Sequence, residues 1–284
     1  MIQIVTDSTC DLDPADANAL GIHIIPLTLC FGEHSYIDGI TLDRETFYDM
    51  LSRTDRLPTT SQLNPMDILN AVSPLLENGD EVVGIFLSSR LSGTFQSASI
   101  AAAMAESSRF HLVDSLNVTF GLALLVRIAC RLRDEGKNAA AIARTLERLK
   151  SRVRLIAVVD TLKYLQMGGR INAASAVMGN LLGINPLVGV VDGAVEAIGK
   201  ARGKKSAFRH LLTLCGQEIP DERYPIYLGH THAPEAMKEM QAMLTPFLKH
   251  PTDVFCAEIG PVIGTHVGPG AVGLAYIAKP LTVC

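Results

Sequence analysis

Short apolar runs rich in β-branched residues alternate with longer helical patterns up to about residue 160. The runs have the length and polar flanks of β-strands. They are Ile2–Val5, Ile24–Leu29, Glu81–Leu87, Phe110–Val113 and Val153–Val159. Between them, Thr94–Ala105 predicts one helix, and Leu116–Glu135 predicts a long helix that ends at Gly136. Asn138 suits the N-cap of the next helix, which is expected to run to about Lys150. Strands that alternate with helices favour a mainly parallel sheet covered on both faces.

The order of predicted strands and helices changes after residue 160. Val188–Val191 and Ala194–Ile198 flank Asp192-Gly193, which is typical of a hairpin with a type I′ turn. Helical patterns at Lys204–Glu218 and Pro234–Lys249 are interspersed with three further strand-like runs. Those runs are Pro225–Leu228, Asp253–Ile259 and Ala271–Ile277. We therefore expect two domains, residues 1–160 with a parallel sheet and residues 161–284 with a mixed sheet.

Composition narrows the function classes. The chain has 284 residues, a size that fits two domains, and 48% of them are hydrophobic, enough for a core and an apolar cavity. The net charge is −4 and no strongly basic region occurs, which argues against a wide nucleic-acid surface. Tryptophan is absent and aromatics make up only 5%, so platforms for stacking bases are hard to build. The sequence predicts no nucleic-acid partner.

The N-terminus and the cysteines point to the cytoplasm. Ile2–Val5 follows Met1 without a charged segment and apolar core, so no signal peptide is expected. Two stretches without charge, Ile171–Val191 and Ile259–Ala278, contain Gly and Pro and are not continuous apolar runs, so no transmembrane helix is expected. The six cysteines include no CxxC pair, which indicates neither a zinc site nor a disulfide framework.

Polar residues end four of the predicted strands. They are Thr6-Asp7-Ser8-Thr9, Ser88-Ser89, Asp114-Ser115 and Asp160-Thr161. Carboxyl ends of parallel strands share one edge, where ligands bind in open α/β folds, although the same residues also serve as helix caps. The loop Ser88-Ser89-Arg90-Leu91-Ser92-Gly93-Thr94 goes further, because three Ser, one Thr and one Gly precede a helix. Free N–H groups at a helix start favour a phosphate or carboxylate.

Other polar motifs carry weaker signals. The turn Pro58–Pro65 contains Thr59-Thr60-Ser61, and a structural turn explains it equally well. Residues 268–273 match G-x-G-x-x-G but leave no room for a βαβ unit, so we expect a tight turn that presents His266. His230 and His232 stand at positions that face opposite sides of a strand, which disfavours a metal site. A short basic cluster is either a solvated helix start or a docking and phosphate-steering surface; it comprises Lys200, Arg202, Lys204, Lys205 and Arg209.

Taken in order, five motifs resemble those of the DegV family over nearly the whole chain. They are Val5–Leu12, Thr60-Ser61-Gln62, Leu87–Ala98, Leu162–Leu165 with Gly168–Ile171, and His266 before Gly268–Gly273. The resemblance implies an N-terminal three-layer α/β/α domain with a mainly parallel sheet and a C-terminal two-layer α/β domain with a mixed sheet. It also implies that a long-chain fatty acid binds at the interface of the two domains, with no cofactor and no catalytic activity of the chain itself.

The resemblance further implies a partner and a set of site residues. Members act as acyl-carrying subunits of bacterial fatty acid kinase, which present the carboxylate to a separate ATP-dependent kinase that makes acyl-phosphate. On the matching positions, the carboxylate ligands would be Thr60 or Ser61, Ser92 with Gly93 and Thr94, and His266. Arg170 and Arg202 would face the kinase or the phosphoryl group.

Two other functions stay open at this point. A serine hydrolase would use Ser92 as nucleophile, His266 as base and Asp7 or Asp114 as orienter, but the sequence contains no G-x-S-x-G elbow. A binder of phosphosugars or of dihydroxyacetone-type ligands would need a small polar pocket in place of a long apolar one.

Overall fold

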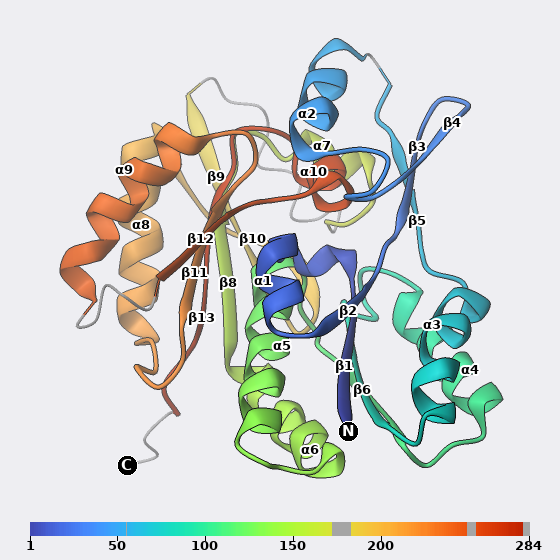
Figure 1. Cartoon of the computed structure of the whole chain (residues 1–284). Coiled ribbons are helices and arrows are strands. Elements are labelled where there is room, and N and C mark those ends of the chain that lie inside the picture. Colours follow the sequence, from blue (N-terminus) through green and yellow to red (C-terminus); the bar gives the residue numbers. More distant parts are fainter. Residues whose placement is uncertain (55, 172–182, 249–253, 281–284) are drawn as a thin grey trace.

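Two sheets pack on opposite sides of a central helix. The computed structural model describes residues 1–54, 56–171, 183–248 and 254–280. Helix α5 (Thr119–Asp134) lies between a four-stranded sheet and a six-stranded sheet, and further helices cover the outer faces (Figure 1). Because α5 faces a sheet on each side, eleven of its sixteen residues are buried, and its charged residues are confined to its second half.

The four-stranded sheet is entirely parallel. Its strands are β1 (Ile2–Asp7), β2 (Ile22–Ile25), β6 (Glu81–Phe86) and β7 (Phe110–Asp114), in the order β2-β1-β6-β7. Helices α3 (Pro65–Glu77) and α4 (Thr94–Ala105) cover one face, and α5 with α6 (Ala139–Leu149) covers the other. The predicted helix 94–105 and the predicted cap at Asn138, whose side chain accepts from Ala141 N, are confirmed.

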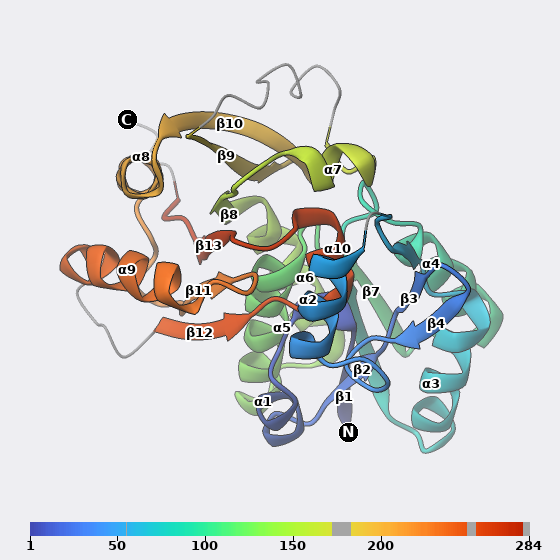
Figure 2. The same ribbon diagram turned by 90° about the horizontal axis from the view of Figure 1, so that it is seen from above.

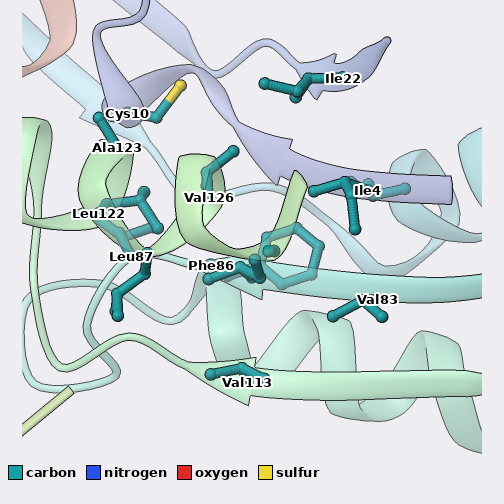
Figure 3. Close-up of a cluster of buried hydrophobic side chains, with 14 of the residues drawn as sticks. Ile4, Cys10, Ile22, Val83, Phe86, Leu87, Val113, Leu122, Ala123 and Val126 are labelled. Atoms are coloured by element: carbon teal, nitrogen blue, oxygen red, sulfur yellow. The ribbon is translucent and has the colours of Figure 1, made fainter. Parts of the chain in front are cut away.

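The main core lies between this sheet and α5. Figure 3 shows Leu122 and Val126, one turn apart on α5, directed toward the strands that carry Ile4 and Phe86. All four side chains are fully buried. The opposite side of α5 presents Phe120, which stacks on Tyr227 of the second sheet with ring centroids 5.6 Å apart. The helix therefore joins residues of both sheets in one apolar cluster, while a separate cluster lies between the six-stranded sheet and helices that cover its outer face.

The six-stranded sheet is mixed. Its order is β10-β9-β8-β13-β11-β12, in which only β11 and β12 run parallel. The bounds are β8 Val153–Val158, β9 Ile184–Val191, β10 Ala194–Arg202, β11 Ile226–His230, β12 Val254–Glu258 and β13 Val272–Ile277. Helices α8 (Lys204–Gln217) and α9 (Pro234–Leu244) cover the outer face. The predicted hairpin is confirmed, because β9 and β10 pair antiparallel around Asp192 and Gly193, which both have positive φ.

The strand predicted over Ile24–Leu29 is wrong. The run divides at Pro26, which has no N–H to donate to a ladder, so that β2 ends at Ile25 and a new strand begins at Thr28. Strand β3 (Thr28–Phe31) joins β4 (His34–Ile37) and β5 (Thr59–Ser61) in a separate antiparallel sheet, order β4-β3-β5, and α2 (Arg44–Arg53) follows β4. An apolar run alone does not reveal this change of sheet.

The strand predicted at Val153–Val159 exists but belongs to the other sheet. Strand β8 pairs antiparallel with β9 and β13, so Asp160 and Thr161 do not lie at the edge shared by the parallel strands. The six-stranded sheet thus begins before the domain boundary expected at residue 160. The division into residues 1–160 and 161–284 stays a proposal.

The remaining elements are short. They are η1 (Ser8–Cys10), α1 (Pro14–Ala19), η2 (Lys150–Arg152), α7 (Lys163–Met167), η4 (Thr245–Phe247) and α10 (Pro261–Val267). Helix α10 packs against α2, α7 and strands β3 and β5 of the small antiparallel sheet, and Figure 2 shows it beside α2. His266 is in the last turn of α10, and the expected turn follows at Gly268 and Gly270, both with positive φ.

A few expectations fall on parts that the structure does not describe. Residues 172–182 of the stretch 171–191, Lys249 at the end of the predicted helix, and Cys284 lie outside the described residues. None of the helices in the described ranges combines the length and the apolar character that crossing a bilayer requires.

Candidate functional site

The loop between β6 and α4 is held by its own hydroxyls. Ser88 is fully buried and its Oγ donates to Gly193 O at 2.7 Å, which ties the loop to the β9–β10 hairpin turn. A Cβ on Gly193 would lie 2.7 Å from Ser88 Oγ, and the φ of Gly193, +84°, also favours glycine. Ser88 is therefore engaged in fixing the loop, and Ser89 is exposed.

Ser92 and Thr94 form one hydrogen-bonded unit at the start of α4. Ser92 Oγ accepts from Thr94 N at 3.2 Å and lies 3.0 Å from Thr94 Oγ1. Thr94 is fully buried and its Oγ1 accepts from Leu63 N at 3.3 Å. Gly93 between them packs on Gln62, whose Oε1 would be 2.0 Å from an added Cβ. Thr94 thus holds the Ser92 hydroxyl in place through hydrogen bonds. Because Gly93 has no side chain, Gln62 can pack directly against its backbone.

His266 joins this region from a distant part of the sequence. Its Nε2 lies 2.8 Å from Thr60 Oγ1, which β5 supplies. Its Nδ1 is buried, has no hydrogen-bond partner among the described residues, and would be 2.3 Å from a Cβ on Gly168. Burial, and then the charge of Arg170, lower the pKa of His266 to about 4. The imidazole is therefore neutral at physiological pH.

Arg170 places a positive charge beside these groups. It follows α7, and its Nη1 donates to Gly168 O at 2.6 Å while its Nε donates to Leu91 O at 3.3 Å. These two carbonyl groups hold the guanidinium between the β6–α4 loop and the loop after α7. The family resemblance implies that Arg170 faces a partner. In the structure, Arg170 also lines a cavity.

An outer cavity of about 170 Å³ unites most of the predicted residues. Its polar wall consists of Thr60, Ser61, Gln62, Ser92, His266 and Arg170, and Gly93 also lines it. Of the other predicted residues, Thr94 lies behind Ser92, and Arg202 is exposed at the end of β10 and does not line the cavity. The polar groups come from β5, the β6–α4 loop, α10 and the loop after α7.

An inner, apolar cavity of about 60 Å³ adjoins the outer one. It lies between α5 and the inner face of the six-stranded sheet, and Leu155, Ala157, Val188 and Val190 are among its lining residues. The two cavities share five lining residues, namely Val118, Leu165, Val195, Ile263 and Val267. A polar mouth that leads into an apolar interior suits a ligand with one anionic head group and an apolar chain.

The arrangement does not support a serine hydrolase. His266 bonds to Thr60, and Ser92 bonds to Thr94. The carboxylate of Asp7 accepts from Thr9 and from Leu87 N, and that of Asp114 accepts from Ser89 N and Leu116 N. Both carboxylates stabilise turns at the strand ends, so a nucleophile, base and orienter are not aligned.

The basic cluster divides into an inward and an outward part. Lys204 Nζ donates to Gly270 O at 2.8 Å and pairs with Asp160 Oδ1 at 3.0 Å, which holds the turn after His266. Lys200, Arg202, Lys205 and Arg209 are exposed. Lys204 is thus structural, and the exposed members remain available to a partner.

Sequence reasoning missed part of the site. Gln62 belongs to the motif Thr60-Ser61-Gln62, but the resemblance implies no role for it, yet it lines the outer cavity and contacts Gly93. The apolar lining of the inner cavity was also missed. Alternate positions on β8 and β9, such as Leu155 with Ala157, were a signal, because residues two apart share a face of a strand.

Comparison with known proteins gives consistent matches over the full length. The family model described as "Uncharacterised protein, DegV family" matches residues 1–279. A DegV domain-containing protein of Caldanaerobacter subterraneus subsp. tengcongensis is 35% identical over 279 residues, which covers 98% of this chain and 99% of the relative.

Solved structures share the fold and carry descriptions of fatty acid binding. A DegV family protein from Thermus thermophilus, described for its fatty acid binding, aligns with a TM-score of 0.90 at 31% identity over 98% of this chain and 99% of its own. A stearic acid-binding protein from Eubacterium ventriosum aligns with a TM-score of 0.84 at 27% identity, again over 98% and 99%. The predicted fold class is confirmed by these neighbours and by the strand pairing.

Proposed function

This chain belongs to the DegV family, and from that premise we propose that it binds a long-chain fatty acid at the interface of its two halves. The polar mouth that continues into an apolar chamber is the observation that carries the proposal. The descriptions of related structures as fatty acid-binding proteins support it. The acid is a ligand, and the proposal requires no cofactor.

The carboxylate binds in the outer cavity. Thr60, Ser61 and Ser92 supply hydroxyl donors, Gly93 and the first turn of α4 supply backbone N–H groups, and Thr94 holds Ser92 in place. His266 is neutral, so it shares a hydrogen bond with Thr60 without adding a charge. A buried carboxylate is costly unless it is hydrogen-bonded or paired, and these groups with Arg170 meet that need.

The acyl chain supplies most of the affinity. Each buried CH₂ contributes about 0.8 kcal/mol, so a few groups in the inner cavity outweigh one hydrogen bond to the carboxylate. A phosphosugar or a small hydroxylated ligand would leave this apolar space unfilled. The pair of cavities therefore favours the fatty acid over such a ligand.

The chain acts as a carrier and not as an enzyme in this proposal. It shields the acyl chain in the cytoplasm and presents the carboxylate to a separate ATP-dependent kinase, which forms acyl-phosphate. Arg170 at the cavity mouth and the exposed Arg202 would face the kinase or the phosphoryl group. Positive charge at those positions suits a transferred phosphate.

Native mass spectrometry of the purified protein tests the proposal. We expect a copurified acid in the range of about C14–C18, because such a chain is long enough to pass from the mouth into the inner cavity. Addition of ATP and a fatty acid kinase subunit to the same sample should then yield acyl-phosphate. A protein that is reproducibly empty and takes up no stearic acid contradicts binding; uptake without acyl-phosphate contradicts only the carrier role.

A further inference from the structure

Helix α10 is anchored at its first turn by two buried side chains from the N-terminal half. The Asp11 carboxylate accepts from Gly260 N through Oδ1 at 2.8 Å, and Tyr48 OH donates to Ile259 O at 3.0 Å. Asp11 and Tyr48 are 4% and 3% exposed. The two bonds bind successive residues that lead into α10, one at an N–H and one at a carbonyl. Hydrogen bonds to a backbone N–H and to a backbone carbonyl therefore both hold this segment in place.

Close packing along one side of α10 leaves it little room to shift. A Cβ on Gly260 would lie 2.9 Å from Asp11 Oδ1, and one on Gly264 would lie 2.8 Å from the Tyr48 oxygen. Gly260 and Gly264 are four positions apart and so share a face of the helix. Packed interiors do not deform continuously. Loss of the bonds from Asp11 and Tyr48 therefore shifts the position of the whole helix.

The same helix carries one wall of the proposed fatty-acid site. Val262, Ile263 and Val267 line the outer cavity, and His266 at the far end bonds to Thr60. Seven residues of α-helix span only about 10 Å, so a displacement at Gly260 reaches His266 through a rigid element. The bond to Gly260 lies at the start of α10, and His266 lies in the last turn of the same short helix.

We propose that Asp11 is a positioning residue for the fatty-acid site, which sets the place of His266 by holding the start of α10. The inference rests on the proposed fatty-acid binding. It gives a role to the last acidic residue of the N-terminal motif Val5–Leu12, which lines neither of the two cavities described above.

The cost of burying Asp11 supports a specific role. Burial raises the pKa of its carboxyl to about 7, although the Thr119 hydroxyl, the charge of Arg44 and the bond from Gly260 N all act in the opposite direction. A polar group in such a place is unfavourable unless it makes a bond that matters. Both the neutral and the ionised carboxyl accept from Gly260 N, so the anchor needs the oxygen and not the charge.

A pair of substitutions at Asp11 separates the anchor from general stability. Asp11 has φ +53°, which both Gly and Asn tolerate. Asp11→Gly removes the acceptor, and Asp11→Asn keeps an oxygen in its place. We expect the dissociation constant for myristic acid, measured by titration calorimetry, to rise about 10-fold in Asp11→Gly and less than 3-fold in Asp11→Asn.

Ring ¹⁵N signals of His266 provide a readout that stability alone does not move. They should shift in Asp11→Gly without ligand, and return close to wild type in Asp11→Asn. Asp80→Ala is the matched control, because Asp80 is 3% exposed and bonds Met1 N and Gln3, away from α10. It should lower the melting temperature and leave both the myristic acid affinity and the His266 signals unchanged.

The outcomes distinguish the two proposals. Wild-type affinity and unchanged His266 signals in Asp11→Gly overturn the positioning role, as does an equal loss of affinity in Asp80→Ala. If Asp11→Gly does not fold, Tyr48→Phe decides, since it removes only the bond to Ile259 O; we expect about 3-fold weaker binding, and no change overturns the role. If the wild type binds neither myristic nor stearic acid, the proposed function fails, while the His266 signals still test the positioning of α10.

Discussion

The outer and the inner cavity meet behind α10 but are built in different ways. Thr60, Ser92, His266 and Arg170 bring polar groups to the outer cavity from a strand, a loop, a helix end and a second loop. Much of the inner cavity is lined by alternate strand residues, such as Leu155 and Ala157 of β8 and Val188 and Val190 of β9. Loops and element ends thus supply hydrogen bonds, while a regular strand surface supplies apolar area.

This difference separates two kinds of recognition. In the proposed function, hydrogen bonds in the outer cavity act on a carboxylate, which is the same for every fatty acid. Contacts in the inner cavity act on the chain and grow with its length. Changes in the inner cavity should therefore discriminate between acids, and changes in the outer cavity should affect all acids alike.

Filling the inner cavity should have the largest effect. Ala157 lines that cavity, and Ala157→Phe would occupy space that the proposed chain needs. We expect stearic acid to bind at least 100-fold more weakly, because that factor corresponds to only about three to four displaced CH₂ groups. Octanoic acid should lose much less. Titration calorimetry with both acids measures the ratio.

A matched control adds the same ring elsewhere. Ala242→Phe places it on the exposed side of α9 and should leave both affinities unchanged. An equal loss for stearic and octanoic acid in Ala157→Phe would show that the inner cavity does not hold the chain.

Replacement of His266 should change how stability depends on pH. The folded pKa of about 4 lies below the usual value of 6.5, so the unfolded chain takes up this proton first as the pH falls. Between pH 7 and pH 5 the histidine therefore costs the wild type about 2 kcal/mol of unfolding free energy. His266→Gln removes that loss. Between pH 7 and pH 5, the free energy of unfolding measured in urea should therefore change by about 2 kcal/mol more in the stabilising direction in the variant than in the wild type.

Other titrating groups do not obscure this comparison. Burial raises the pKa of Asp7 and Asp38 to about 6 and that of Asp11 to about 7, which acts in the opposite sense, but all three are present in both proteins. His34→Gln removes an exposed imidazole on β4 and serves as the control. Parallel pH profiles for wild type and His266→Gln would contradict a neutral, buried His266.

Removal of the Ser92 hydroxyl should have the smallest effect. The hydroxyl is partly engaged with Thr94, so we expect its loss to cost about 1.5 kcal/mol, the lower end of the range for a hydrogen bond to a charged group, and Ser92→Ala to weaken binding about 10-fold. The factor should be the same for octanoic and stearic acid. Ser89→Ala in the same loop is the control, because Ser89 is exposed. A loss that grows with chain length would place Ser92 against the chain rather than the carboxylate.

Short-range sequence patterns were enough to predict several helix starts and a hairpin turn of this protein. Helix α4 begins at Thr94 and α6 is capped by Asn138 where small polar residues precede a helical pattern, and the hairpin turns at Asp192-Gly193. Each of these depends on residues within a few positions of one another, so a single stretch of chain carries the information. The motifs also indicated the DegV family and most of the polar residues that line the outer cavity.

Pairings between distant residues were decided only by the tertiary structure. The run 24–29 contributes to two sheets, and β8 pairs with β13, because hydrogen bonds to partners far along the chain override a local apolar pattern. Thr60 meets His266 across 206 positions, and Asp11 meets Gly260 across 249. No periodicity encodes such contacts. They arise when α10 packs between the halves, and with them the site acquires its neutral histidine and its apolar interior.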